Sequence, residues 1–146
     1  MRPKCIALFV AVLSSMIVSA EEFVPIWPEG KMPFGPKKDA TIAAETVSEK
    51  GIVKNVSVPG IEVFLPEKKP SRGSMAIIIC SGGAYGCLDY EKEGRQTARY
   101  LQKIGVAAFV LKYRLRQYPR KASLADLQRA MAVVRANAKK WNIAPS

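Results

Sequence analysis

The sequence has 146 residues, 49% of them hydrophobic, and a formal net charge of +11 at pH 7. This length is typical of one small domain, and three cysteines are too few for a disulfide scaffold. The sequence contains no histidine, so it lacks both the commonest general base and the commonest transition-metal ligand. We therefore expect neither a metal ion nor a cofactor.

The N-terminus has the pattern of a secretory signal peptide. Two basic residues, Arg2 and Lys4, precede an apolar run over residues 5–18, and small residues lead up to Ala20. The run is shorter than the roughly 20 residues of a membrane-spanning helix, although an uncleaved anchor is the alternative. We predict a signal peptide over residues 1–20, an extracytoplasmic (periplasmic or secreted) protein without stable membrane insertion, and a net charge of +9 after removal of two basic residues.

The rest of the chain divides into an extended segment over residues 21–50 and a folded part over residues 51–146. Four prolines and no periodicity over residues 21–36 indicate an extended surface segment, anchored by Trp27. Further on, Val53–Val58 and Ile61–Leu65 alternate apolar and polar residues around a Pro-Gly turn. This pattern predicts a half-exposed antiparallel hairpin.

The next elements alternate between strand and helix. The apolar runs Met75–Cys80 and Val106–Leu111 indicate parallel strands covered on both faces. Between them, apolar residues at helical spacing predict a helix from about Tyr90 to Ile104, and Gly105 ends it. A second helix is predicted from an N-cap at Ser123 to about Trp141. The expected apolar positions of the two helices are Ala98, Leu101 and Ile104, and Leu124, Leu127, Met131, Val134, Ala138 and Trp141. The fold class is therefore α/β.

A glycine-rich loop follows the first of these strands, with the sequence Gly82-Gly83-Ala84-Tyr85-Gly86. It matches neither G-x-G-x-x-G nor a P-loop, which argues against phosphate binding. Such a loop at the carboxyl end of a parallel strand can supply the backbone N–H groups of an oxyanion hole. A tight turn without function is the alternative. The flanking Cys80 and Cys87 are expected to be unpaired, although an extracytoplasmic compartment would permit a bridge.

Several blocks of the sequence, taken in order, resemble one family. They are IWPEGKMP, AIIICSGGAYG, Glu93-Gly94, GVAAFVLKYRL, Tyr118-Pro119 and DLQRAMAVVRANAKKWNIAP. In this order and spacing they resemble the N-terminal half of an α/β-hydrolase of the esterase/lipase type. The resemblance is closest to secreted acetyl-xylan-esterase-like proteins, which are often labelled xylanase. It implies an incomplete α/β-hydrolase fold, in which an N-terminal antiparallel hairpin leads into a parallel βαβ sheet with flanking helices.

The resemblance also implies roles for the glycine loop. The N–H groups of Gly83 and Ala84 would form the oxyanion hole, Gly82 and Gly86 would permit the bend, and Tyr85 would line the substrate pocket. Ser81 and Ala84 depart from the commonest family residues at these positions. Ala84 still offers an N–H, so we expect the function to survive if the backbone there does not require a positive φ, which would cost a non-glycine residue about 1 kcal/mol.

Two further sets of residues have a non-catalytic interpretation. The basic and aromatic run around Tyr113, Arg114 and Leu115 could bind nucleic acid, but a solvated loop after a strand is the preferred interpretation, and no nucleic-acid partner is expected. Asp126 is expected in the first turn of the last helix, where a carboxylate favours the helix dipole. The resemblance implies that this position is structural and is not the acid of a catalytic triad.

None of the family's catalytic triad is present, since the sequence has no G-x-S-x-G serine and no histidine. Our first hypothesis is the N-terminal part of a secreted serine carboxylesterase for small acyl esters, acetyl esters above all, with this chain inactive alone. The resemblance alone implies that these acetyl groups are on polysaccharide. The second is a non-catalytic carbohydrate- or anion-binding module derived from a hydrolase. The third is a small complete enzyme that uses Asp89, Glu91 and Glu93 as a carboxylate cluster.

Overall fold

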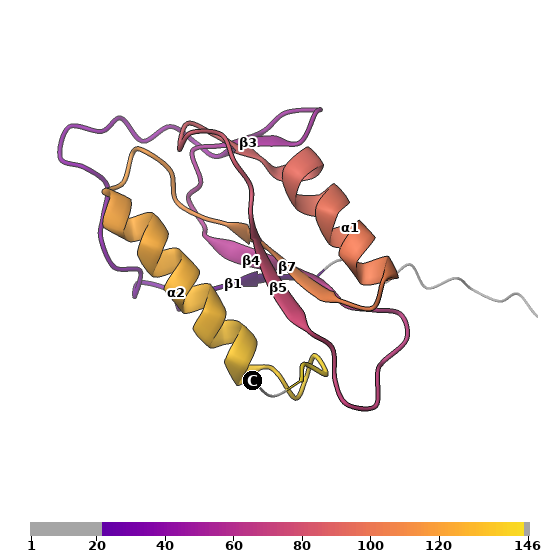
Figure 1. The fold of residues 1–146 in the computed structure, drawn as a ribbon. Helices are drawn as coiled ribbons and strands as arrows, with labels where there is room; N and C mark the ends of the chain where they lie inside the picture. The colour runs from indigo at the N-terminus through magenta and orange to yellow at the C-terminus, as the bar shows by residue number, and fades with distance from the viewer. Residues whose placement is uncertain (1–21, 145–146) are drawn as a thin grey trace, which may run out of the picture.

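The computed structural model describes residues 22–144, and the predicted signal peptide lies outside them. The main sheet has the strand order β1-β4-β7-β5 (Figure 1). β4 pairs antiparallel with β1 and with β7, whereas β5 pairs parallel with β7. The bounds of these strands are Glu22–Pro25 (β1), Gly60–Phe64 (β4), Ala76–Cys80 (β5) and Ala107–Lys112 (β7). A second, antiparallel sheet has the order β2-β3-β6, formed by Thr46–Val47, Ile52–Lys54 and Leu88–Asp89.

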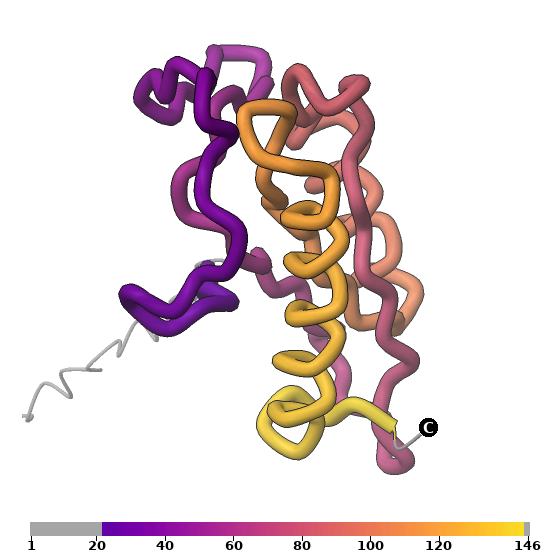
Figure 2. The backbone as a smooth tube through the Cα atoms, turned by 90° about the vertical axis from the view of Figure 1, so that its left-hand side faces the viewer, coloured from indigo at the N-terminus to yellow at the C-terminus, as the bar shows by residue number. Residues whose placement is uncertain are grey.

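Two α-helices cover opposite faces of the main sheet, as Figures 1 and 2 show. α2 (Arg120–Ala136) packs through Ala130 and Val134 on the face that includes Phe109 of β7. α1 (Gln96–Lys103), which continues the π-helical turn η1 (Tyr90–Arg95), packs on the other face. The domain is therefore a three-layer α/β/α arrangement with one hydrophobic cluster on each side of the sheet.

The predicted strand–helix–strand unit is confirmed, and so is the stop at Gly105, whose φ is +87°. The burial of the predicted apolar positions on the two helices differs in part from the prediction. Ile104, Leu124 and Met131 are exposed, whereas Ala98 and Val134 are buried as expected.

The predicted hairpin is wrong. β3 pairs with β2 and β6, while β4 lies between β1 and β7, and all five residues of β4 are buried. The polar residue that suggested a solvent-facing side is Glu62, which is 5% exposed and accepts two hydrogen bonds from Arg95 Nε, at 2.9 and 3.0 Å. A buried ion pair in the middle of a strand gives the same alternation as a half-exposed strand.

The predicted start of the second helix is also wrong. α2 begins at Arg120, directly after Pro119 in an extended conformation, so Ser123 is an interior residue. Ser123 is buried, and its Oγ donates to the carbonyl of Arg114 at 2.6 Å. The hydroxyl that suggested a cap therefore holds the preceding loop against the helix.

The N-terminal segment is held more firmly than an extended surface segment requires. Residues Glu22–Pro25 form β1 at the edge of the main sheet, and Ile26 is buried. Trp27 is the anchor that the sequence predicts, because its Nε1 donates to Asp126 Oδ1 at 2.7 Å and its ring lies under Arg129. Within residues 22–144, no helix has the length and apolar character needed to cross a membrane.

Candidate oxyanion-binding site

The glycine loop lies at the carboxyl end of β5, and Gly82, Gly83, Ala84 and Tyr85 are all exposed. The bend occurs at Gly83, Ala84 and Tyr85, whose φ angles are +136°, +50° and +59°. Gly86 N–H donates to Gly83 C=O at 2.9 Å, which closes a four-residue turn with positive φ at both central residues. Gly82 and Gly86 were expected to permit the bend, but neither has a positive φ. The lack of a side chain at Gly82 instead serves the contact with Glu93, because a Cβ there would lie 2.8 Å from Glu93 Oε2.

The backbone donors of the loop are unequally used. Gly82 N–H donates to Glu93 Oε2 at 2.6 Å, and the N–H groups of Gly86 and Cys87 both donate to Gly83 C=O. Within the part of the chain that the structure describes, the N–H groups of Gly83 and Ala84 donate to no protein acceptor. The two donors implied by the family resemblance are therefore adjacent, exposed and available.

The expected absence of a positive φ at Ala84 is wrong: its φ is +50°, which costs a non-glycine residue about 1–2 kcal/mol, although its N–H stays free. We predict that Ala84→Gly raises the free energy of unfolding by about 0.5–1 kcal/mol, because relief of this strain exceeds the added entropy of the unfolded glycine. Gly83→Ala should have the opposite effect and cost more than about 2 kcal/mol, since a Cβ there would lie 2.2 Å from the carbonyl oxygen of Cys87. Urea unfolding followed by tryptophan fluorescence measures both changes, and a stabilising Gly83→Ala would contradict the observed turn.

Glu93 and Gly94 hold the loop against the sheet. The Glu93 carboxylate accepts the Gly82 N–H, and this contact fixes the first residue of the loop. Gly94 lets η1 approach β7, because a Cβ there would lie 2.7 Å from Val110 Cγ1 and 2.8 Å from Ser81 Oγ. The Glu-Gly pair of the sequence therefore positions the candidate site from the η1 side.

The predicted alternative of a carboxylate cluster is wrong. Asp89 Oδ1 accepts the N–H of Lys92 at 3.3 Å, which caps η1, and Glu91 pairs with Arg99 at 2.6 Å. With Glu93 bound to the loop, each of the three carboxylates has its own partner. Over residues 22–144, no group of acidic, cysteine or histidine residues is arranged to hold a metal ion.

A second segment, residues 113–119, supports the loop from the β7 side. Tyr113 Oη donates to Ser81 C=O at 2.7 Å, and Arg116 N–H donates to Tyr85 C=O at 2.9 Å. The rings of Tyr85 and Tyr113 meet edge to face at 6.1 Å between centroids. The loop is thus fixed at both ends by hydrogen bonds, which hold the free N–H groups of Gly83 and Ala84 in one orientation.

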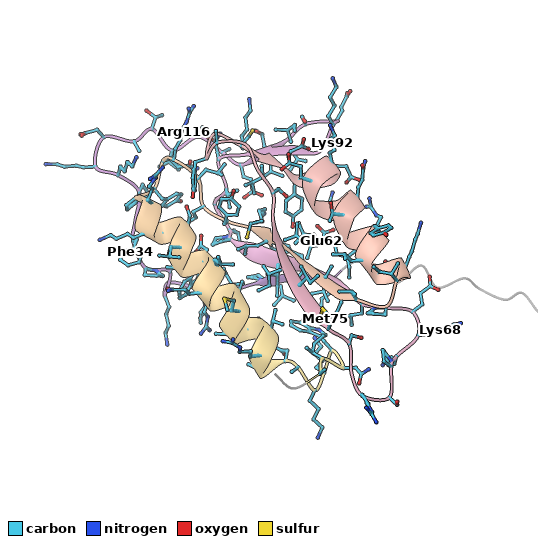
Figure 3. The ribbon with its side chains drawn as sticks, viewed as in Figure 1. Phe34, Glu62, Lys68, Met75, Lys92 and Arg116 are labelled. Atoms are coloured by element: carbon cyan, nitrogen blue, oxygen red, sulfur yellow. The ribbon has the colours of Figure 1, made fainter. Side chains whose placement is uncertain are left out.

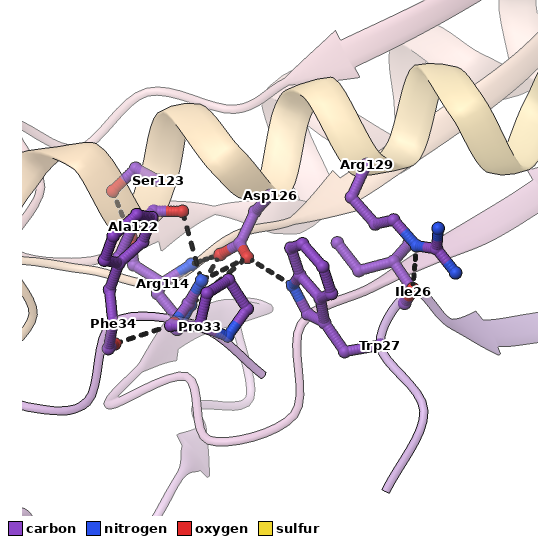
Figure 4. Close-up of polar contacts among 9 residues, drawn as sticks. All are labelled: Ile26, Trp27, Pro33, Phe34, Arg114, Ala122, Ser123, Asp126 and Arg129. Atoms are coloured by element: carbon purple, nitrogen blue, oxygen red, sulfur yellow. Dashed lines mark hydrogen bonds and ion pairs between the residues drawn. The ribbon is translucent and has the colours of Figure 1, made fainter. Parts of the chain in front are cut away.

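This segment is not the solvated loop that the sequence predicts. Arg114, Leu115 and Tyr118 are buried, and Arg114 is 0% exposed. The guanidinium of Arg114 binds the Asp126 carboxylate through Nε and Nη2, at 2.9 and 2.7 Å, and donates to the carbonyls of Pro33, Phe34 and Ala122 (Figure 4). A fully satisfied guanidinium can be buried, whereas an unpaired one cannot.

Asp126 lies in the second turn of α2, not the first, and it is completely buried. Besides Arg114 it accepts Trp27 Nε1, so it joins the N-terminal segment, α2 and the end of β7. Asp126 was predicted to be structural, and the structure adds the buried network that it joins. The pattern of an arginine after a strand and an aspartate twelve residues later is too common to reveal such a pair.

Tyr85 also lines a hollow of about 200 Å³ between the loop and α2, together with Cys80, Arg120 and Leu127. Burial raises the pKa of the Cys80 thiol, so the thiol is neutral at pH 7 and is a poor nucleophile. Cys80 and Cys87 are both free, as predicted.

Beyond the loop, β5 is the outermost strand of the main sheet. An isolated parallel bridge joins Ser74, just before β5, to Ile143. Ser74 N–H donates to Asn142 C=O at 2.8 Å, and Ala144 N–H donates to Ser74 C=O at 2.9 Å. After α2 the chain therefore returns parallel to β5 along its free edge.

Esterases from other organisms are similar to this chain in sequence and in fold. No family model matches the chain. An acetylxylan esterase of Xylanibacter ruminicola is 37% identical over 109 residues, which cover 73% of this chain and 22% of the relative. The crystal structure of an acetyl ester-xyloside bifunctional hydrolase from Caldicellulosiruptor lactoaceticus matches with a TM-score of 0.64 and 28% identity, over 90% of this chain and 42% of that one. The resemblance to esterase-type hydrolases is confirmed.

A thermophilic esterase of Thermogutta terrifontis has the same fold, with a TM-score of 0.54 and 24% identity over 71% of this chain. A carboxylesterase structure from Lactobacillus plantarum matches at 0.50 with 26% identity over 60% of the chain. The chain spans between about a fifth and two fifths of the length of these esterase relatives. The mixed sheet with helices on both faces is therefore an α/β-hydrolase-like arrangement.

Proposed function

We propose that this chain is the oxyanion-hole-bearing part of an extracytoplasmic serine carboxylesterase that hydrolyses small acyl esters, acetyl esters above all, on polysaccharide. The observation that carries this proposal is the pair of free N–H groups at Gly83 and Ala84, on a rigid loop at the carboxyl end of β5, in a chain related to esterases. Two adjacent N–H donors suit the oxygen that becomes negative when a nucleophile attacks an ester carbonyl.

The remaining catalytic groups would come from a segment beside β5. The backbone of Ser74 already bonds outward to residues 142 and 144, so by alternation Ala76, Ile78 and Cys80 present their N–H and C=O groups to the free edge. A groove of about 800 Å³ runs along this edge under α2, lined by Met75, Ile78, Val134 and Ile143 among others. A further parallel strand placed there would end next to the glycine loop, where a nucleophilic serine could reach a carbonyl held by Gly83 and Ala84.

In this mechanism the described residues stabilise the negative charge that develops on the ester oxygen, and they do not transfer protons. Gly83 and Ala84 would donate to the carbonyl oxygen as it gains charge, while Tyr85 would line the hollow for the acyl or alcohol group. The serine, its acid and the histidine base must be supplied by residues that this sequence does not contain, because it has no histidine and no G-x-S-x-G.

We predict that the purified 146-residue chain does not hydrolyse p-nitrophenyl acetate above the buffer rate. A chimera in which the matching part of this chain, 73% of its length, replaces the homologous 109-residue stretch of the Xylanibacter ruminicola acetylxylan esterase should be active, because the esterase would then supply the triad. The control is the same chimera with its catalytic serine replaced by alanine. Turnover by the isolated chain, or a folded chimera without activity, would count against the proposal.

A second hypothesis is a non-catalytic module that binds a carbohydrate or an anion. The free N–H groups of Gly83 and Ala84 suit this role as well, since they need only an acceptor. A folded but inactive chimera, together with oligosaccharide binding by the isolated chain, would favour the module over the esterase.

A further inference from the structure

Two arginines flank the end of the glycine loop that is furthest from Glu93. Arg116 is exposed, and its backbone N–H donates to Tyr85 C=O. Its guanidinium lies close to Gly86, because Nη1 is 3.8 Å from the position that a Cβ on Gly86 would occupy. Arg120 is also exposed, and its guanidinium carbon lies 5.7 Å from the centroid of the Tyr85 ring. Figure 3 shows Arg116 at the end of the sheet opposite Met75, which is the end where the loop lies.

Neither guanidinium has an acidic partner among residues 22–144. The contrast with other arginines is direct, since Arg95 and Arg114 bind Glu62 and Asp126. Glu93, the carboxylate that touches the loop among residues 22–144, is engaged by Gly82 N–H. The positive charge at this rim is therefore not neutralised by the protein.

The charge exceeds what an oxyanion hole requires. A carbonyl oxygen that gains charge needs N–H donors at short hydrogen-bond distance, and Gly83 and Ala84 offer two such N–H groups. Guanidinium groups at the rim are suited to a full carboxylate, which they bind with paired N–H donors. A neutral acetylated sugar offers no such group.

We propose that the substrate of this site carries a carboxylate close to the scissile ester, and that Arg116 and Arg120 bind this carboxylate. The substrate class is then an acetylated polysaccharide with acidic sugar units. This inference rests on the proposed esterase function, and it adds a specificity-determining pair of residues to it. The Tyr85 ring lies beside the Arg120 guanidinium and Tyr85 directly follows Ala84 in the loop, so the bound carboxylate would lie near the ester.

The test uses two acetylated xylo-oligosaccharides of equal length, one neutral and one with a glucuronate branch. Binding to the full chain is followed through the amide NMR signals of Gly83 and Ala84. At low salt we expect the acidic oligosaccharide to bind about 10-fold more tightly, because each exposed ion pair contributes a few-fold. At about 0.5 M salt the preference should fall to about 3-fold or less, since exposed charges are screened.

Matched variants separate this site from the general positive charge. Arg116→Gln and Arg120→Gln should each reduce the preference to about 3-fold. Arg72→Gln removes the same charge from the loop before β5, at the opposite end of the sheet, and should leave the preference unchanged. Equal binding of the two oligosaccharides, no binding of either, or an equal loss with Arg72→Gln would overturn the inference.

The outcome is distinguishable from failure of the proposed function. If the chimera hydrolyses both oligosaccharides with the same kcat/KM and Arg116→Gln changes neither, the esterase proposal stands and the carboxylate inference fails. If the acidic preference and its dependence on Arg116 are observed but the folded chimera has no activity, the carboxylate site stands and the esterase proposal fails.

Discussion

Arg114→Met is expected to lower the free energy of unfolding by about 3–5 kcal/mol, the largest stability effect that we predict for a single substitution. The reason is that Asp126 would keep a fully buried carboxylate without its counter-ion, since both side chains of the pair are 0% exposed. The substitution also leaves the carbonyls of Pro33 and Phe34 without a donor. Urea unfolding followed by tryptophan fluorescence gives the change.

The double variant Arg114→Met with Asp126→Leu should be more stable than either single variant, because it leaves no unpaired buried charge. This comparison holds even if a single variant fails to fold. The matched control is Lys140→Met, which breaks a 2.8 Å pair with Glu22 between side chains that are about half exposed. It should change stability by less than about 1 kcal/mol. A single variant at Arg114 that costs no more than this control would contradict the role of the network.

Replacing the N–H of Ala84 by an ester oxygen is expected to lower kcat of the active chimera by about 10²–10³, with little change in KM. Incorporation of lactic acid at position 84 makes this change while keeping the methyl side chain and the backbone path. The effect falls on kcat because the donor acts on charge that develops in the transition state. The N–H of Ala84 has no acceptor in the protein, but the same change makes the Gly83 carbonyl, which accepts from Gly86 and Cys87, a weaker ester acceptor. The free energy of unfolding of the variant is therefore measured beside kcat, so that loss of the turn is distinguished from loss of the donor.

The control for this experiment is lactic acid at Ala43, an exposed residue of the N-terminal segment whose N–H also lacks a protein acceptor. That change should leave kcat within about 2-fold. Incorporation of glycolic acid at Gly83 should repeat the loss seen at Ala84, because the two N–H groups act on the same oxygen. A loss below about 3-fold at both positions would show that the loop does not form an oxyanion hole.

Contacts that join distant residues explain why the candidate site was only partly predictable. The loop is recognisable from its glycines and its place after a strand. Its bend was expected at Gly82 and Gly86, whereas the residues with positive φ are Gly83, Ala84 and Tyr85. Positive φ at Ala84 and Tyr85 is imposed by the hydrogen bonds of the turn and by anchoring to Glu93 and Arg116. Composition does not reveal strain at a non-glycine residue, because strain persists only where surrounding contacts enforce it.

Local patterns by themselves determined β5, β7, the existence of the two helices and the stop at Gly105, but not the ends of α2. Apolar runs, helical spacing and glycine conformation act over a few residues, so they can be identified from adjacent positions. The tertiary structure alone decided the neighbours of β4, the burial of Glu62 and Arg114, and which N–H groups of the loop remain free. A charged side chain can be buried only when a partner from elsewhere in the chain satisfies it, and that partner is known only once the chain is folded.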